Sequence, residues 1–117
     1  TKLPLRVAVI ATSSLFALSH TGTGETTASI AVTIVAVFAL AVLQSALYVV
    51  GGSLIPVIAL HIWWDLMIFS GGGIDLDADA TALAWTGLIA TIIMTLSYGT
   101  YLLIRHVPEH TPQRTRP

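Results

Sequence analysis

The stretch "ASIAVTIVAVFALAVLQSALYVV", residues 28–50, carries no charge, and its few polar interruptions include Thr33, Gln44, Ser45 and Tyr48. A helix needs roughly 20 apolar residues to cross the hydrocarbon core of a bilayer. The many β-branched residues would favour strands in water. In lipid a spanning segment must satisfy its own backbone hydrogen bonds, which selects helix over an open sheet. The stretch therefore predicts a membrane-spanning helix.

The composition of the whole chain also indicates a lipid environment. Hydrophobic residues make up 55% and charged residues only 9%, and the mean hydropathy is +0.85, outside ordinary soluble usage. The net charge of -1 and the placing of Lys and Arg near the chain ends exclude nucleic acid as a partner. The lack of Cys excludes disulfides, thiolate metal sites and cysteine nucleophiles. The chain is thus expected to be an integral membrane protein.

Three further apolar stretches are found at about 4–20, 54–70 and 81–104. Together with 28–50 they predict an all-α integral membrane protein, a bundle of about four transmembrane helices. Residues 1–106 are expected to form this membrane domain, the C-terminal part of a longer one. Residues 107–117, which contain three Pro and scattered charge, are expected to be a disordered cytoplasmic tail.

The charges outside the spans predict the orientation. In a four-span arrangement the basic residues fall on one side and the loop carboxylates on the other; the basic set is Lys2, Arg6, Arg105, Arg114 and Arg116, and the acidic set is Glu25, Asp75, Asp77 and Asp79. Basic residues mark the cytoplasmic side. The sequence therefore predicts a multi-pass protein of the cell membrane with both ends in the cytoplasm.

Ionisable residues within the spans are candidates for a functional site. A carboxylate such as Asp65 at the centre of a membrane helix costs about 2.5 to 3.5 kcal/mol even on the lenient insertion scale. His61 and Asp65 share one helix face at the i, i+4 spacing, as Phe16 and His20 do on the first span, with Ser13 one turn back. If the two faces meet, His20, His61 and Asp65 surround one cavity and match the ligand set of a hydrolytic metal ion with an open position.

A purely structural interpretation stands beside this one. His20 lies at the end of a span, where an interfacial histidine is common, and His61 and Asp65 are able to form an intrahelical hydrogen bond that tempers the burial of both. The depths also conflict, since His20 lies about 24 Å along its helix from Pro4 whereas His61 lies only about 10 Å beyond Leu54. The two histidines meet only if the helices tilt or enter the bilayer at different depths.

Other positions within the spans predict packing between helices. Gln44 and Tyr48 share a face and are expected to form interhelical hydrogen bonds. Gly87 and Gly99 are too far apart to form a small-x-x-x-small contact. These residues therefore concern the assembly of the bundle rather than chemistry.

Two motifs resemble those of a known family. "TSSLFALSH", residues 12–20, with Phe16-x-x-x-His20, is similar to the second motif of the CPBP intramembrane metalloproteases, which include the Rce1-type CAAX prenyl endopeptidases and the Abi proteins. "SLIPVIALHIWWDLMIF", residues 53–69, with His61-x-x-x-Asp65, resembles the third motif, His-x-x-x-Asn or Asp. The two motifs occur in the family order, and the resemblance covers about residues 3–70.

The resemblance implies an α-helical membrane endopeptidase that hydrolyses a peptide bond within or beside the bilayer with the help of a divalent metal ion, zinc being one candidate. It implies that His20 and His61 hold the metal or the attacking water. Asp65 would polarise the scissile carbonyl or complete the site. The implied partners are membrane lipids and a peptide or membrane-protein substrate, prenylated in the CAAX case.

The family's first motif, Glu-Glu-x-x-x-Arg, does not occur, because the only glutamates are Glu25, in the loop after His20, and Glu109, in the tail. The chain is therefore expected to be an incomplete protease that is inactive alone. Two alternatives stay open. One is a catalytically silent membrane binding or bacteriocin-immunity protein on the same scaffold, and the other is a small proton-relay or transport subunit that uses His61 and Asp65.

Overall fold

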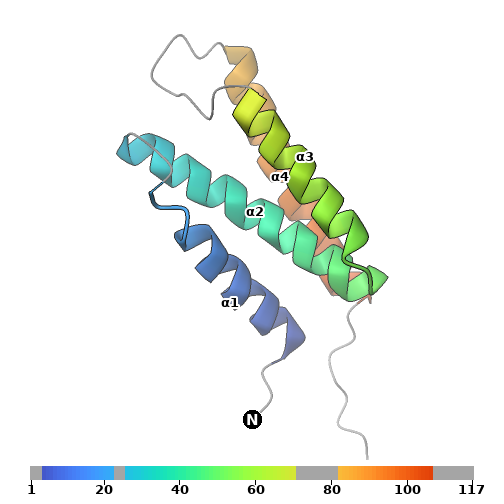
Figure 1. Ribbon diagram of the computed structural model, residues 1–117. Coiled ribbons are helices and arrows are strands. Elements are labelled where there is room, and N and C mark those ends of the chain that lie inside the picture. Colours follow the sequence, from blue (N-terminus) through green and yellow to red (C-terminus); the bar gives the residue numbers. More distant parts are fainter. Residues whose placement is uncertain (1–3, 23–25, 71–81, 107–117) are drawn as a thin grey trace, which may run out of the picture.

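The computed structural model describes residues 4–22, 26–70 and 82–106, and these residues form four helices (Figure 1). The helices are α1 (Leu5–Leu18), α2 (Thr27–Gly51), α3 (Ile55–Ser70) and α4 (Ala82–His106). They lie within a few residues of the four predicted stretches and confirm an all-helical chain over the described part. The predictions made for the acidic loop between α3 and α4, for Glu25 and for the tail at 107–117 fall outside the described residues.

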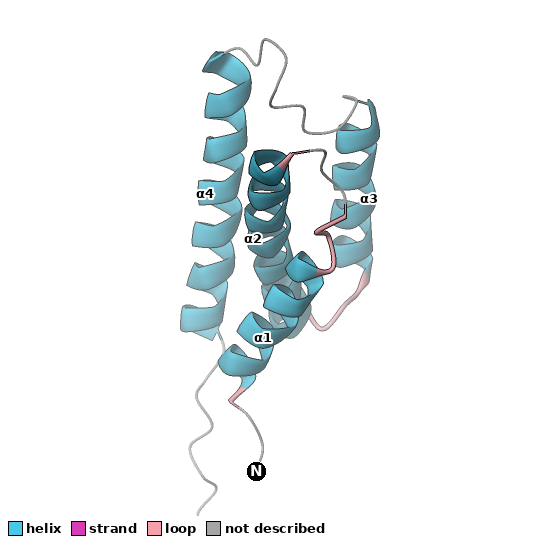
Figure 2. Cartoon of the chain, turned by 90° about the vertical axis from the view of Figure 1, so that its left-hand side faces the viewer, coloured by secondary structure: helices cyan, strands magenta, loops and turns pink. Residues whose placement is uncertain are grey.

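Helix α2 is the centre of the molecule. It contacts α1, α3 and α4, and its contact with α4 is the most extensive (Figures 1 and 2). One cluster of buried side chains joins α2 to α1 and α4; its members are Val9, Val42, Leu43, Ala46, Leu102 and Leu103. The run that predicted the first spanning helix therefore supplies the core on which the other helices pack.

Local signals set both ends of α2. At its start, the Thr26 hydroxyl accepts a hydrogen bond from the Ser29 backbone N–H (3.2 Å), and the Ser29 hydroxyl accepts one from the Thr26 N–H (3.0 Å), which completes a capping box. At its end, Gly52 adopts a left-handed conformation with φ 63° and donates to the Tyr48 carbonyl. Helix α3 starts only three residues later, at Ile55, and so returns alongside α2.

The α2–α4 contact depends on Gly99. A Cβ atom added at Gly99 would lie 2.9 Å from the Leu43 Cα and 3.0 Å from the Leu43 nitrogen, closer than side chains approach a backbone. Glycine here lets the two helix backbones meet directly, as small residues do between membrane helices. Gly87, on the same helix, differs from Gly99, because a Cβ atom added there would meet nothing within 4 Å.

The described surface is rich in large apolar side chains. Ile55 is 77% exposed, Met94 71% and Leu15 69%. Helix α2 and residues Thr86–His106 of α4 are long and apolar enough to cross a membrane. Helices α1 and α3, with 14 and 16 residues, extend about 21 and 24 Å at 1.5 Å per residue. They are shorter than the roughly 30 Å hydrocarbon core, so among the described helices length alone marks α2 and α4 as able to span it, and the expected four-span bundle stays a prediction.

Candidate functional site

The carboxyl end of α1 is closed by two side chains that turn back on Phe16. The Ser19 hydroxyl donates to the Phe16 carbonyl at 2.7 Å, and His20 Nδ1–H donates to the same oxygen at 2.8 Å. The His20 ring also meets the Phe16 ring edge-on, with 4.8 Å between ring centroids. Because a carbonyl only accepts, the proton of the neutral His20 ring lies on Nδ1.

Phe16 joins the two sequence motifs in space. Its ring lies 4.8 Å from the ring of His20, just after α1, and 6.3 Å from the His61 ring on α3, measured between centroids. Both histidine rings therefore lie near the ring of one phenylalanine. The contact between Phe16 and His61 links the two sequence motifs in space.

The conflict in depth is resolved by the arrangement of the helices. Helices α1 and α3 run in the same general direction along α2, and α1 ends part-way along α2 (Figures 1 and 2). The end of α1 therefore stands beside the first turns of α3. His20 follows the end of α1, and His61 lies in the second turn of α3. The two residues therefore lie at a similar level along α2.

His61 has protein partners at both ring nitrogens. The amide nitrogen of Gln44, on α2, lies 3.3 Å from Nδ1, and the carboxylate Oδ2 of Asp65 lies 3.6 Å from Nε2. The Asp65 contact is longer than a hydrogen bond but within ion-pair distance. The side chains of His61 and Asp65 are 41% and 48% exposed, so the pair stands at the edge of the helix packing rather than inside it.

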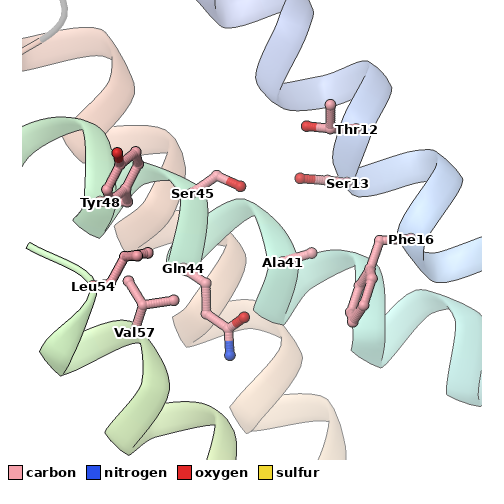
Figure 3. A pocket seen from close by; sticks show the side chains of 9 residues that line it. All are labelled: Thr12, Ser13, Phe16, Ala41, Gln44, Ser45, Tyr48, Leu54 and Val57. Atoms are coloured by element: carbon pink, nitrogen blue, oxygen red, sulfur yellow. The ribbon is translucent and has the colours of Figure 1, made fainter.

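A groove of about 290 Å³ opens beside this pair, between α1, α2 and the start of α3 (Figure 3). Its lining is mostly apolar but includes hydroxyl and amide groups; the residues are Thr12, Ser13, Phe16, Ala41, Gln44, Ser45, Tyr48, Leu54 and Val57. Ser13 is only 2% exposed, and within the described residues its hydroxyl has no hydrogen-bond partner. His20, His61 and Asp65 are not among the residues that line the groove, but two lining residues, Phe16 and Gln44, contact His61.

The described residues do not supply a complete metal site. No group of three or more His, Cys, Asp or Glu side chains able to hold a metal ion occurs among them. Asp65 is the only carboxylate within the described ranges, because the other five acidic residues lie outside them. The Gln44 amide and the Asp65 carboxylate also face the two His61 nitrogens that a metal would use. This arrangement orients an imidazole and does not by itself bind a cation.

The expectation that Gln44 forms an interhelical hydrogen bond is confirmed by its contact with His61. Tyr48, on the same face, lines the groove. The sequence did not indicate that Gln44 would meet a site residue. Its position one turn before Tyr48, on a face of α2 otherwise apolar, was the only signal.

The fold and the site together define a protein whose described part is helical, with many exposed apolar side chains and with two histidines that each contact Phe16. Comparison with known proteins gives the family. Residues 2–67 match the model of the Rce1-like family, described as type II CAAX prenyl endopeptidase Rce1-like, and the chain belongs to this family. The match includes His20, His61 and Asp65, and the family is membrane-associated. No curated protein and no solved structure matches the chain significantly.

Proposed function

We propose that this chain carries the histidine part of an intramembrane endopeptidase site of the CAAX prenyl type, with His20, His61 and Asp65 as its site residues. The observation that carries the proposal is that the Phe16 ring lies close to the rings of both His20 and His61. This contact joins two motifs, on α1 and α3, that both lie within the family match. A structural role for either histidine alone would not require the two motif faces to meet.

The chemistry follows from the groups around His61. Peptide hydrolysis needs a water molecule that is oriented and partly deprotonated as it attacks the carbonyl. His61 and His20 offer imidazole groups for that water, and Asp65 holds the His61 ring from the adjacent turn. The neighbouring groove, apolar with a few hydroxyl groups, suits a peptide or membrane-protein segment and, in the CAAX case, its prenyl group.

A divalent metal ion such as zinc would supply a water of lowered pKa and a Lewis acid at the carbonyl. His20 and His61 are the residues proposed to contribute to it, and further ligands would have to come from outside the described residues. We also propose that the chain is multi-pass in the cell membrane, among lipids, with both ends cytoplasmic. The glutamate base expected of the family would likewise be supplied by a part of the protein beyond the described ranges.

The test is cleavage of a prenylated CAAX peptide by the full-length protein in lipid vesicles. His20→Ala and His61→Ala should each lower the rate by at least about 10²-fold, the usual contribution of a positioned acid–base group. Both variants should keep the wild-type helical signal and thermal midpoint. His106→Ala, at the exposed end of α4 beside Tyr101, is the matched control and should cleave normally. Normal cleavage by either site variant would remove that histidine from the site, and no cleavage by the wild-type protein would favour a silent binding protein.

A further inference from the structure

Two neighbours of His61, on different helices, determine which nitrogen of its neutral ring carries the proton. Gln44 Nε2 carries only N–H donors, and it lies 3.3 Å from His61 Nδ1. A donor at Nδ1 requires a lone pair there, so the ring proton must lie on Nε2. Nε2 in turn faces the Asp65 carboxylate, which only accepts, at 3.6 Å. Both neighbours therefore select the same tautomer, with the proton on Nε2.

We propose that Gln44 is a positioning residue that sets the tautomer and the ring orientation of His61. The inference rests on the proposed function for its catalytic meaning, but the tautomer itself is a property of the folded chain. Asp65 is one turn from His61 on the same helix, so α3 alone provides that contact. Gln44 is on α2, so only the packed α2–α3 pair provides the second.

Helix α2 gives Gln44 a fixed place. The residue before Gln44, Leu43, and the residue two positions after it, Ala46, are buried in the core at 8% and 0% exposure. Gln44 itself is half-buried and lines the groove beside Phe16 (Figure 3). The backbone that carries Gln44 is thus fixed by neighbours that are buried in the core.

The amide of Gln44 has an NH2 donor and a carbonyl acceptor, which have opposite effects on the position of the His61 proton. Its N–H side favours the proton on Nε2, whereas its carbonyl side would accept a proton from Nδ1 and leave a lone pair on Nε2. A histidine that binds a metal or takes a proton through one nitrogen commonly donates from the other to an oxygen of the protein. Rotation of one amide would therefore convert Nε2 of His61 from a donor toward Asp65 into an acceptor for water or a cation.

The experiment measures the tautomer directly. The full chain is labelled with nitrogen-15 at histidine, placed in lipid nanodiscs and examined at about pH 9, where ordinary imidazoles are neutral. The His61 signals are identified by their loss in His61→Ala. In the wild type, Nε2 should carry the proton and Nδ1 should show the shift of an unprotonated nitrogen.

Two variants change the partner without changing its place. Gln44→Glu supplies only acceptor oxygens at this pH, so Nδ1, unprotonated in the wild type, should now carry a proton in part or all of the population, while Asp65 still accepts from Nε2. Gln44→Leu removes one of the two groups that select the tautomer, so the form protonated at Nδ1 should gain population, although Asp65 still favours the proton on Nε2. Ser45→Ala changes the adjacent groove residue, which forms no hydrogen bond with His61 in the described part of the chain, and as the matched control it should keep the wild-type pattern.

A wild-type ring already protonated at Nδ1, or an unchanged pattern in both Gln44 variants, would overturn the proposal. Loss of the His20 signals together with those of His61 would indicate unfolding. Far-ultraviolet circular dichroism on the same sample distinguishes unfolding from a change of tautomer. Cleavage is measured in parallel. The expected tautomer without any cleavage would reject the proposed function while leaving the role of Gln44 standing.

Discussion

Gly99 of α4 lies directly against the backbone of Leu43 on α2, so that a methyl group at Gly99 would stand 2.9 Å from the Leu43 Cα atom. Leu43 cannot yield by a side-chain rotation, since the opposing atoms belong to the backbone of the central helix. The contact therefore sets the distance between the two helices that share the largest interface.

Gly99→Ala should consequently push α4 away from α2. Overpacking of this kind typically costs about 1 to 3 kcal/mol, which exceeds the helix-propensity gain of about 1 kcal/mol for alanine over glycine. The free energy of unfolding, measured in mixed micelles by denaturant titration, should fall. Gly87→Ala, on the same helix with open space around its Cα, should keep or raise it. Equal stability of the two variants would show that α2 and α4 do not meet at Gly99.

The same contact shows where sequence reasoning stopped. Hydrophobic length predicted the helices and their order, because it is a property of short segments. Thr95 precedes Gly99 at the small-x-x-x-small spacing, whereas we compared Gly99 only with Gly87. That spacing marks a candidate helix contact, but which residue Gly99 meets depends on the position of Leu43, which packing alone determines. The Gln44–His61 pair is similar: an interhelical bond was expected, but its partner was set by the register between α2 and α3.

The end of the first helix was missed for a different reason. The predicted stretch ran to residue 20, whereas α1 ends at Leu18. The side chains of Ser19 and His20 bond to the Phe16 carbonyl and compete with the helix for that oxygen. The faces that carry Phe16 with His20 and His61 with Asp65 were expected to approach each other. Residue spacing does not predict how short α1 is or how far along α2 it ends.

Asp65→Asn should retain most of the activity that Asp65→Leu loses. The Asn side-chain oxygen can accept a hydrogen bond from His61 Nε2–H as the carboxylate does, although without charge assistance. We expect Asp65→Asn to cleave within about tenfold of the wild type and Asp65→Leu to lose about 10² or more, as for loss of a group that orients a catalytic base. The rates are measured on the prenylated peptide in vesicles. Equal loss in both variants would mean that the charge of Asp65, rather than its acceptor oxygen, is what the site needs.

Two buried serines should respond to alanine with opposite signs. Ser13 is 2% exposed with an unpartnered hydroxyl, and a buried polar group without a hydrogen bond costs about 1 to 3 kcal/mol. Ser13→Ala also improves helix propensity, so the free energy of unfolding should stay the same or rise. Ser29, 7% exposed, accepts a hydrogen bond from the Thr26 N–H in the capping box of α2, and Ser29→Ala should cost about 0.5 to 1.5 kcal/mol, the net worth of that bond.

Both serine variants are compared in one unfolding series, so that solvent and lipid are identical. A destabilised Ser13→Ala would show that the hydroxyl has a bonding partner in the folded protein, most simply water in the groove. A neutral Ser29→Ala would show that α2 does not need its capping box.

The exposed apolar side chains of α1, α3 and α4 should face lipid. Leu15, Ile62 and Met94 are 69%, 53% and 71% exposed, an arrangement that is costly in water and expected in a bilayer. The chain has no Cys, so a single cysteine placed at each position takes one nitroxide label without background. In vesicles the labels should relax strongly with oxygen, which concentrates in lipid, and weakly with a water-soluble nickel chelate. A label at Gly22, in the turn after α1, is the comparison and should favour nickel. Strong nickel accessibility at Leu15, Ile62 and Met94 would place these faces in water and remove the membrane from the proposed function.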